Sequence, residues 1–403
     1  MANVSSSNGL EKRPKLRFPG FDEPYKQCRI GDIYAERSQR GASDMELLSV
    51  TMNDGVKPRS EIEGKDNSSE DKSNYKIVRK GDMVYNSMRM WQGANGISPC
   101  DGIVSPAYTV LMPKQEINNG YFAALFKSAN LINEFRKNSQ GMTSDTWNLK
   151  YPQIETIKIQ IPSVSEQDKV SELFGVLDAR IVAQAQLVES LKKYKRGLLF
   201  REFAPFVHDA SDIEYEGKIH DFFSLSSGST PSSTNKAFYS GSIRWVSSGE
   251  LKPKYLYETN QHISSEAASM CNLREYPANT LLIAMYGLEA AGVRGTASIL
   301  GVPSTISQAC MAIQQTGEID VEYLYYWYIY NGQWIGIRIA QGTKQQNLST
   351  DTLGNLKINA PSLSKQKEVC KLLSHIDNRI EKENQKLDLL TSIKRGLLHQ
   401  LFM

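Results

Sequence analysis

The sequence lacks the patterns that would place it in a membrane, outside the cell or around a metal ion. Its five cysteines are scattered along 403 residues and never spaced as C-x-x-C, which argues against a disulfide framework or a zinc site. No apolar run reaches the ~20 residues of a membrane span, and the N-terminus has no signal-peptide core. The five histidines form no cluster of metal-ligand spacing. We therefore expect a metal-free cytoplasmic protein with free thiols.

The sequence also lacks a recognisable active site. Gly287 and Gly292 have the spacing of two P-loop glycines, but Val293 and Arg294 stand where Lys and Ser or Thr must hold phosphate and magnesium. No G-x-G-x-x-G opens a βαβ unit, and the Asn/Asp-Pro-Pro-aromatic box of amino-methyltransferases is missing. These absences predict a chain that performs no catalysis of its own.

The size and charge of the chain leave several functions open. A length of 403 residues suggests two or three domains. A net charge of +3 and a pI near 8.4 permit contact with nucleic acid without requiring it.

The most informative feature is an internal repeat. Ile161-Pro-Ser-Val-Ser-Glu-Gln-Asp-Lys-Val resembles Ala360-Pro-Ser-Leu-Ser-Lys-Gln-Lys-Glu-Val, and Pro162 matches Pro361 at a shift of 361 − 162 = 199. The same shift, without gaps, aligns Lys195-Arg-Gly-Leu-Leu with Lys394-Arg-Gly-Leu-Leu. The chain therefore consists of one unit written twice.

Each repeat ends in a predicted long helix, 163–203 and 362–403, with Ser165 and Ser364 as expected N-caps. Apolar residues recur at alternating spacings of four and three, which is typical of a coiled-coil seam, interrupted at equivalent places by Gln184 and Glu383. The full seam is Val170, Phe174, Leu177, Ile181, Gln184, Val188, Leu191, Leu198, Val369, Leu373, Ile376, Ile380, Glu383, Leu387, Leu390 and Leu397. We expect the two helices to pair antiparallel; the alternative is that each helix caps its own module.

A module precedes each helix: residues 21–162 after a polar tail of residues 1–20, and residues 204–361. Similarity between the modules is weaker, for example Gly81-Asp-Met-Val-Tyr-Asn-Ser-Met against Ala278-Asn-Thr-Leu-Leu-Ile-Ala-Met. Both modules are predicted to be mixed α/β folds with short strands. The aromatic-rich run from Asp320 to Tyr330 is interpreted as a buried helix rather than a stacking platform.

Several motifs, in this order and partly duplicated, carry a family resemblance. They are Arg17-Phe-Pro-Gly-Phe, Arg244-Trp-Val-Ser-Ser-Gly-Glu-Leu, Gln341-Gly-Thr-Lys-Gln-Gln-Asn-Leu and the Pro-Ser-x-Ser-x-Gln helix openings. Together they resemble the DNA specificity subunit of type I restriction-modification enzymes. The first module departs from the pattern, with Leu48-Ser-Val-Thr-Met-Asn-Asp-Gly-Val where the second has the Trp-Val-Ser-Ser-Gly-Glu form.

The resemblance implies a non-catalytic subunit with two target recognition domains, each of which reads one half of a bipartite site in double-stranded DNA. Two long helices would set the spacer between the halves and dock two methyltransferase subunits, which two restriction subunits join. S-adenosylmethionine, ATP and Mg would be bound by those partners, and no cofactor by this chain.

The candidate DNA contacts are loop residues with side chains of the types that read base edges or hold phosphates. Each of them is equally compatible with a solvated loop residue. In the first module they are Asn86, Ser87, Arg89, Trp91, Gln92, Gln140, Thr143, Ser144 and Trp147. In the second module they are Ser247, Ser248, Lys252, Tyr286, Arg294, Thr343, Lys344, Gln345, Gln346 and Asn347.

Two other functions fit the sequence less well. A structural scaffold would use the helices to assemble other proteins without binding DNA, and it would give no salt-dependent shift of a DNA duplex. An enzyme with an unrecognised active site would transfer methyl groups on its own.

Overall fold

The computed structural model describes residues 2–3, 14–41, 44–52, 55–66, 68–204, 213–290, 292–340 and 347–402. The chain divides into two compact units. Unit 1 comprises residues 1–186 and 384–403, and unit 2 comprises residues 187–383. Each unit therefore contains one α/β module, part of helix α5 (Val164–Phe203) and part of helix α10 (Leu363–Leu401).

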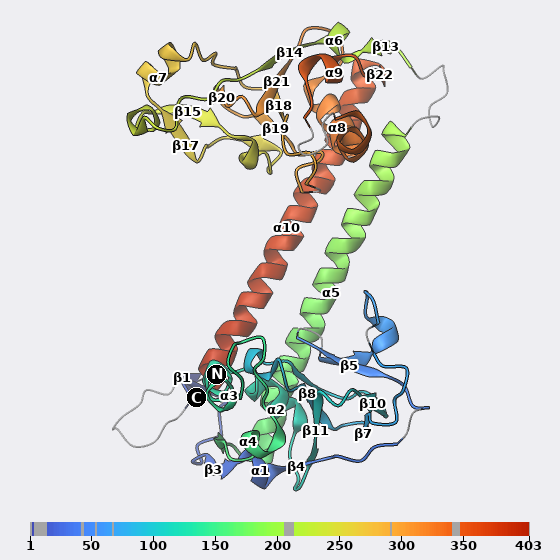
Figure 1. Ribbon diagram of the computed structural model, residues 1–403, viewed down its shortest axis with the longest axis vertical. Helices are drawn as coiled ribbons and strands as arrows, with labels where there is room; N and C mark the ends of the chain where they lie inside the picture. The colour runs from blue at the N-terminus through green and yellow to red at the C-terminus, as the bar shows by residue number, and fades with distance from the viewer. Residues whose placement is uncertain are drawn as a thin grey trace. The chain divides into compact units, whose positions relative to one another are not determined.

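The first module is built on a four-stranded antiparallel sheet of order β4-β11-β8-β9, seen at the lower end of Figure 1. The module also contains three two-stranded sheets, β3 with β12, β5 with β6 and β7 with β10. The strands are β3 (Lys26–Arg29), β4 (Tyr34–Glu36), β5 (Leu48–Thr51), β6 (Gly55–Pro58), β7 (Lys76–Val78), β8 (Met83–Asn86), β9 (Asn95–Ile97), β10 (Gly102–Val104), β11 (Tyr108–Pro113) and β12 (Lys158–Ile161). The helices are α1 (Ile30–Ile33), α2 (Asn119–Leu125), α3 (Ala129–Asn138) and α4 (Tyr151–Ile154), with 3-10 turns η1 (Arg59–Glu61) and η2 (Met90–Gln92). Strand β1 (Ala2–Asn3) pairs with β2 (Leu16–Arg17) ahead of the module.

The second module repeats this plan, with a sheet of order β14-β21-β18-β19-β16 in which β16 joins parallel to β19. The strands are β13 (Tyr215–Lys218), β14 (Phe223–Ser227), β15 (Ile243–Val246), β16 (Tyr255–Leu256), β17 (Gln261–Ile263), β18 (Leu281–Ala284), β19 (Ala297–Leu300), β20 (Thr305–Ile306), β21 (Cys310–Gln315) and β22 (Lys357–Ala360). The helices are α6 (Ile219–Phe222), α7 (Ser265–Met270), α8 (Val321–Trp334), continued by a π-helical turn Ile335–Ile339, and α9 (Thr350–Gly354), with 3-10 turns η4 (Lys236–Tyr239) and η5 (Ser248–Glu250). The two modules share the order β4-β11-β8-β9 and β14-β21-β18-β19, which confirms the duplication and the mixed α/β class.

The structure shifts the sequence alignment of the two modules by one residue. Sequence similarity pairs Gly81 with Ala278, whereas the backbone pairs Gly81 with Asn279: both have positive φ, 91° and 64°, ahead of strands β8 and β18. The strand pairing agrees with this shift. Met83, two residues after Gly81, lies opposite Leu111 of β11, and Leu281, two residues after Asn279, lies opposite Ile313 of β21. A shift of one residue moves strand side chains to the other face, so the sequence similarity misaligned the residues that follow these strands.

Helix α8 is buried on most of its surface, as the aromatic run predicts. Its N-cap Asp320 accepts a hydrogen bond from the Glu322 N–H at 2.8 Å. Eight of its residues are buried, among them Tyr323, Tyr326 and Tyr328. These rings belong to the core of the second module and do not form a surface for stacking bases.

The two long helices are present, but their N-caps differ from the expected ones. Helix α5 begins at Val164 and α10 at Leu363, which places Ser163 and Ser362 at the caps instead of Ser165 and Ser364. The Ser362 hydroxyl accepts a hydrogen bond from the Lys365 N–H at 3.4 Å. The prediction was two residues late because either serine of the Pro-Ser-x-Ser motif can cap a helix, and the helix starts at the first opportunity after the proline.

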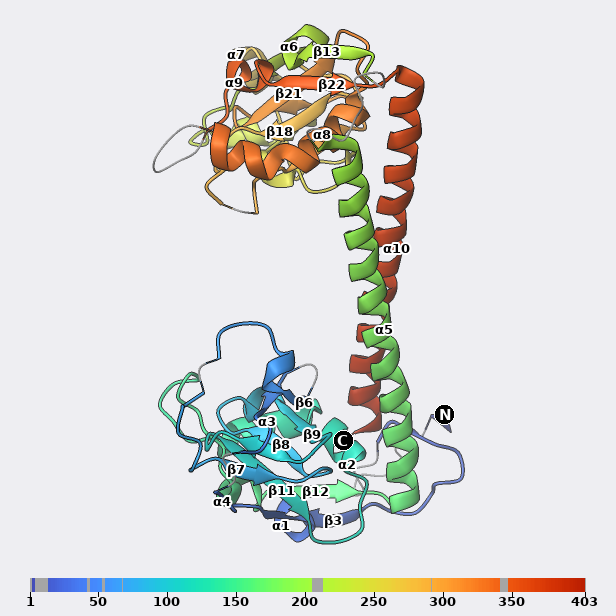
Figure 2. The ribbon, with the colours of Figure 1, turned by 90° about the vertical axis from the view of Figure 1, so that its right-hand side faces the viewer.

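Within each unit the segments of α5 and α10 pack against each other (Figures 1 and 2). In unit 1, Phe174 stacks on Phe402 at 5.8 Å between ring centroids, and Asp178 pairs with Lys394. From Phe174 to Asp178 the chain of α5 runs forward, while their partners run backward from Phe402 to Lys394, so the two segments are antiparallel. In unit 2, Lys195 pairs with Asp377, and these residues are the repeat equivalents of Lys394 and Asp178, since 394 − 195 = 377 − 178 = 199.

Every residue of the predicted seam is buried or half-buried. The polar interruption Glu383 is buried, and its carboxylate forms an ion pair with the Arg379 guanidinium, with Nε and Oε1 2.7 Å apart. Gln184, the equivalent interruption in α5, is half-buried. The alternative interpretation, that each helix caps its own module, is also correct. Val170 and Phe174 of the seam belong to the core of the first module. Leu373 and Ile376 belong to the core of the second module. Pairing and capping are thus combined in the same helices.

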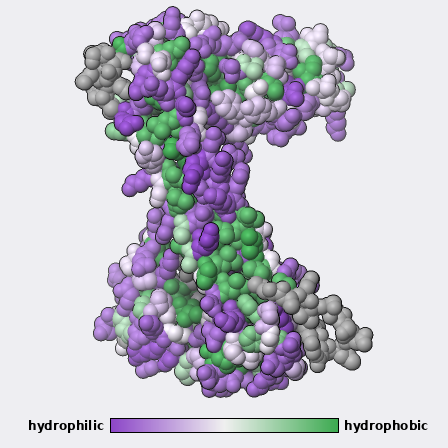
Figure 3. Space-filling model, turned by 180° about the vertical axis from the view of Figure 1, so that it is seen from behind, coloured by the Kyte–Doolittle hydropathy of each residue, from purple (hydrophilic) through white to green (hydrophobic). Residues whose placement is uncertain are grey.

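Some large apolar side chains of the helices stay exposed. Figure 3 shows apolar surface over the second half of α10. The exposed residues are Val176, Val182, Leu187, Tyr194 and Phe200 on α5, and Leu372, Leu389 and Ile393 on α10. Among the described residues, no helix combines the length and apolar character of a membrane span. All five cysteines are free.

Candidate nucleic-acid interface

Two loops of the first module that are far apart in sequence meet in the structure. The loop after β8 carries Ser87, whose carbonyl accepts the Leu149 N–H at 2.8 Å. Next to this bond, Trp91 and Trp147 pack edge to face with ring centroids 5.2 Å apart. The loops of residues 86–92 and 140–147 therefore lie side by side and share one surface.

The same bond recurs in the second module, where the Leu348 N–H donates to the Met285 carbonyl at 2.8 Å. Met285 is the structural equivalent of Ser87, and Leu348 lies 199 residues after Leu149. Candidate residues Tyr286 and Asn347 are neighbours of this bond, and both are exposed. Each module thus holds the same pair of loops together with the same backbone contact.

Arg136 is a basic residue of this surface that the sequence pattern missed. It projects from α3, and its guanidinium carbon lies 5.5 Å from the centre of the Trp91 ring. The Trp91 ring is further fixed by its indole N–H, which donates to the Met88 carbonyl at 3.1 Å. Nothing in the spacing of Arg136 links it to Trp91, because only tertiary packing places α3 beside η2.

Accessibility separates the candidates of the first module. Gln92, Gln140, Thr143 and Ser144 are exposed, whereas Asn86, Arg89, Trp91 and Trp147 are half-buried. Ser87 is buried, and its hydroxyl shares a 2.8 Å hydrogen bond with that of Thr109. Ser87 therefore belongs to the core, and we remove it from the proposed contacts.

In the second module, Ser247 is committed to its own turn. Its N–H and hydroxyl both donate to Glu250 Oε1, at 2.9 and 2.8 Å, which closes η5. Ser248 is half-buried and Lys252 is exposed beside this turn. Lys252 thus remains an accessible cation, while Ser247 shapes the loop that carries it.

Arg294 is likewise engaged within its own loop. Its Nε donates to the Leu288 carbonyl at 2.6 Å and its Nη2 to the Glu289 carbonyl at 2.8 Å. These bonds use the Nε donor and one Nη2 donor and hold the guanidinium against its own loop, so we assign Arg294 to loop support. The candidates Thr343, Lys344, Gln345 and Gln346 lie outside the described residues.

The glutamine of the Pro-Ser-x-Ser-x-Gln motif has a structural role. Gln167 donates to the Pro162 carbonyl and accepts the Asn118 N–H, both at 3.0 Å. Gln366 donates to the Pro361 carbonyl and accepts the Asp320 N–H, both at 2.8 Å. Since Asn118 and Asp320 cap α2 and α8, each glutamine joins the start of a long helix to its own module.

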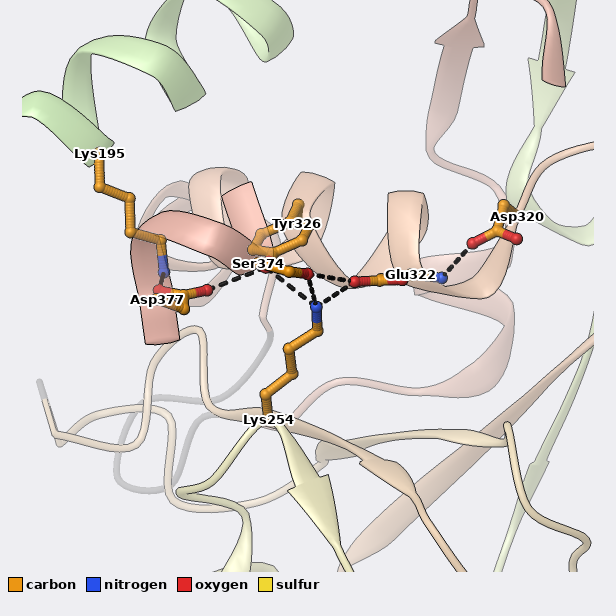
Figure 4. A network of polar contacts seen from close by, with 7 residues as sticks. All are labelled: Lys195, Lys254, Asp320, Glu322, Tyr326, Ser374 and Asp377. Atoms are coloured by element: carbon orange, nitrogen blue, oxygen red, sulfur yellow. Dashed lines mark hydrogen bonds and ion pairs between the residues drawn. The ribbon is translucent and has the colours of Figure 1, made fainter. Parts of the chain in front are cut away.

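A polar network fixes the second module to the helices within unit 2 (Figure 4). The Lys254 ammonium donates to Glu322, to Ser374 of α10 and, at 3.0 Å, to the Tyr326 hydroxyl. Tyr326 in turn donates to Asp377 at 2.9 Å. Burial and the nearby Asp377 charge raise the pKa of Tyr326, so its hydroxyl stays protonated as a donor at neutral pH.

Glu322 of this network, the cap residue Asp320 and the nearby Cys370 form a group of three potential metal ligands. Their donor atoms are already used or unsuited. Asp320 caps α8, and the Glu322 carboxylate pairs with Lys254 and accepts a hydrogen bond from the Ser374 hydroxyl. Burial raises the pKa of the Cys370 thiol, which disfavours the thiolate that a metal would need. The Lys254 ammonium supplies the positive charge at this place.

These features define a class of protein: two homologous α/β modules, each with a pair of joined surface loops and each seated on an antiparallel pair of helical segments. A family profile described as "Type I restriction modification DNA specificity domain" matches residues 23–193 and again residues 211–392. The chain belongs to this family and contains its domain twice.

Individual relatives agree with this assignment. The chain is 28% identical over 190 residues to the type I restriction enzyme MjaIX specificity subunit of Methanocaldococcus jannaschii, covering 46% of this chain and 43% of the relative. It is 25% identical over 229 residues to the EcoR124I/EcoR124II specificity subunit of Escherichia coli, covering 55% of each. The chain thus spans about half the length of these relatives.

Solved structures share the fold. The type I restriction-modification S subunit from M. genitalium superposes with a TM-score of 0.61 at 16% identity, covering 97% of this chain and 99% of that one. A chain of another type I restriction-modification system gives a TM-score of 0.60 at 13% identity, covering 96% and 99%.

Proposed function

We propose that this chain is the DNA-reading specificity subunit of a type I restriction-modification enzyme. Each module would read one half of a bipartite site in double-stranded DNA. The observation that carries the proposal is the conserved loop-joining bond, Leu149 to Ser87 and Leu348 to Met285, beneath loops whose side chains differ. The two modules hold their loops together with the same backbone bond but carry different side chains on those loops. This arrangement suits two modules that read different DNA sequences.

The proposed contacts are the candidates that the structure leaves available. In the first module they are Asn86, Arg89, Trp91, Gln92, Gln140, Thr143, Ser144 and Trp147, joined by Arg136. In the second module they are Ser248, Lys252, Tyr286 and Asn347. We keep Thr343, Lys344, Gln345 and Gln346 from the sequence alone.

The test is to express the chain with its methyltransferase subunits in a host without other adenine methylation and to map the methylated adenines. We expect one two-part sequence whose halves are separated by a constant number of unread bases. The purified complex should shift that duplex, and the shift should weaken as salt rises. Methylation without sequence preference would contradict the proposal, as would methyl transfer by this chain alone.

We further propose that two methyltransferase subunits dock on the helices and that restriction subunits join through them. S-adenosylmethionine, ATP and Mg would be bound by these partners, in the cytoplasm. Tyr194 and Ile393 support two equivalent docking places, because they are repeat equivalents, 393 − 194 = 199. Their side chains are 55% and 44% exposed, and one lies in each unit.

Replacing Tyr194 or Ile393 by Glu should therefore each remove one methyltransferase subunit from the complex, and the double variant should remove both. Losing one central apolar contact weakens an interface by about 2 kcal/mol, or roughly 30-fold. Native mass spectrometry of the co-purified complex gives the stoichiometry. Tyr257→Glu, at an exposed tyrosine of the second module, is the control and should keep both partners. A double variant that retained both subunits would place docking elsewhere.

A further inference from the structure

Met142 is an exposed apolar residue that packs against none of the residues that the structure describes. Its side chain is 100% exposed, and it lies in the loop of residues 139–148, which we call the Met142 loop. The second module has Thr343 in the corresponding position of the Gln-Gly sequence. The apolar tip therefore distinguishes the first module from the second.

The Met142 loop is tied at its base. Gln140 and Asn148 exchange backbone hydrogen bonds of 3.0 and 2.8 Å. This pairing holds the two ends of the loop at the distance of adjacent strands. The loop therefore leaves the module as a closed hairpin-like projection.

The tip of the loop is tied as well. The Thr146 hydroxyl accepts the Thr143 N–H at 3.2 Å and donates to the Thr143 carbonyl at 2.9 Å. Gly141 has a φ of +142°, and a Cβ there would lie 2.6 Å from the Thr146 carbonyl oxygen. Only glycine fits at this position, so Met142 is held outward on a turn of defined shape.

The surroundings of the Met142 loop are aromatic and basic. The loop continues into Trp147, which packs on Trp91, and Arg136 lies over the Trp91 ring. Met88, another exposed apolar residue, adjoins Trp91 through their hydrogen bond. Flat rings and a cation suit stacked bases and phosphates, and an apolar side chain held among them suits a gap between base pairs.

We propose that Met142 is a wedge that inserts between two neighbouring base pairs in the half-site read by the first module. This inference rests on the proposed function. Methionine is one of the side chains that partly unstack a base step when inserted, and its unbranched thioether adapts to the gap. The step that Met142 opens adds to specificity, because pyrimidine–purine steps unstack more easily than others.

The test uses the complex with its methyltransferase subunits and duplexes that carry 2-aminopurine at successive positions of the mapped site other than the methylated adenines. Those adenines stay unlabelled because methyltransferases flip their target base out of the duplex, which would raise the fluorescence there without a wedge. With the natural chain, fluorescence should rise at one step of one half-site. Met142→Ser should abolish that rise and weaken binding about 10-fold, whereas Met142→Leu should preserve both. Met270→Ser, at an exposed methionine of the second module, is the matched control and should change neither.

Two results would overturn the wedge. One is a natural complex that binds its two-part site with no fluorescence rise in either half. The other is a Met142→Ser complex with the same rise and affinity as the natural one. A failure of the proposed function has a different signature, since the natural complex would then not distinguish the two-part site from unrelated DNA.

Discussion

Replacing residues 21–162 with the first recognition module of another family member is expected to change one half of the DNA site and to leave the other half unchanged. The physical reason is that the two modules have separate cores. Tyr121 and Phe126 lie in a cluster with Phe174 and Phe402, all within unit 1. The second module packs on its own cluster around α8 within unit 2. A new first module therefore leaves the loops of the second in place.

The structure also shows what the exchange must preserve. The incoming module must meet Phe402, whose ring lies 5.4 Å from that of Tyr121. Its α2 must offer an N-terminal N–H to Gln167, as Asn118 does at 3.0 Å. The second contact is made by the backbone, so any α2 of the same length and position can supply it.

Methylation mapping of the exchanged protein measures the outcome. The reciprocal exchange of residues 204–361 is the matched control and should alter only the opposite half-site. If either exchange altered both halves, the modules would not read DNA independently, and the one-module, one-half-site proposal would fail.

Replacing Glu166 by Leu is expected to cause the largest loss of stability of any single change considered. Glu166 and Arg17 are 1% and 5% exposed, and Arg17 donates to both carboxylate oxygens, at 3.1 and 2.6 Å. The hydrogen bond to Glu166 is the main reason that the pKa of Arg17 is raised. Without the carboxylate, the buried guanidinium keeps its bond to the Glu23 carbonyl but loses the opposite charge that compensates it, which costs about 3–5 kcal/mol.

The double variant Arg17→Met with Glu166→Leu should regain most of this loss, because it removes both buried charges and leaves apolar side chains of similar size. Urea unfolding followed by circular dichroism measures the difference in unfolding free energy. Lys365→Leu is the matched control, since Lys365 occupies the repeat-equivalent position, 365 − 166 = 199, but is exposed. If the single and double variants lost equal stability, packing rather than charge would hold the N-terminal segment.

This ion pair also marks a place where the two repeats differ. Arg17 belongs to the Arg-Phe-Pro-Gly-Phe segment, and Glu166 to the first turn of α5. The second repeat has Lys365 in that turn and therefore lacks a carboxylate there. The resemblance marked Arg17 as informative, but its partner, 149 residues away, came only from the structure.

The helices were predictable because their pattern is local and repeated. Apolar residues every three or four positions define one face of a helix, and two copies at a constant shift support each other. The same reasoning misplaced the N-caps, because Ser163 and Ser165 are chemically equivalent in the sequence. It misaligned β8 and β18 by one residue, because runs of apolar residues fit a neighbouring register almost equally well.

The candidate interface was less predictable because accessibility and hydrogen bonding are tertiary properties. Ser87 and Thr143 look alike as polar loop residues, yet one bonds to Thr109 in the core and the other is exposed. The Arg294 guanidinium has donors that could read a nucleobase, but two of them already bond the Leu288 and Glu289 carbonyls. Arg136 was overlooked because a charged residue on a helix gives no signal of the tryptophan beside it.

By itself, the sequence determined that the chain is a duplicated α/β module with a long helix after each copy, and it pointed to the family. These properties follow from periodicity and repetition, which can be read along the chain. Only the tertiary structure decided which loops meet, which glutamines and ion pairs join module to helix, and which candidate side chains remain exposed. Those properties depend on residues brought together from distant positions, where burial and competing hydrogen-bond partners decide what each side chain can do.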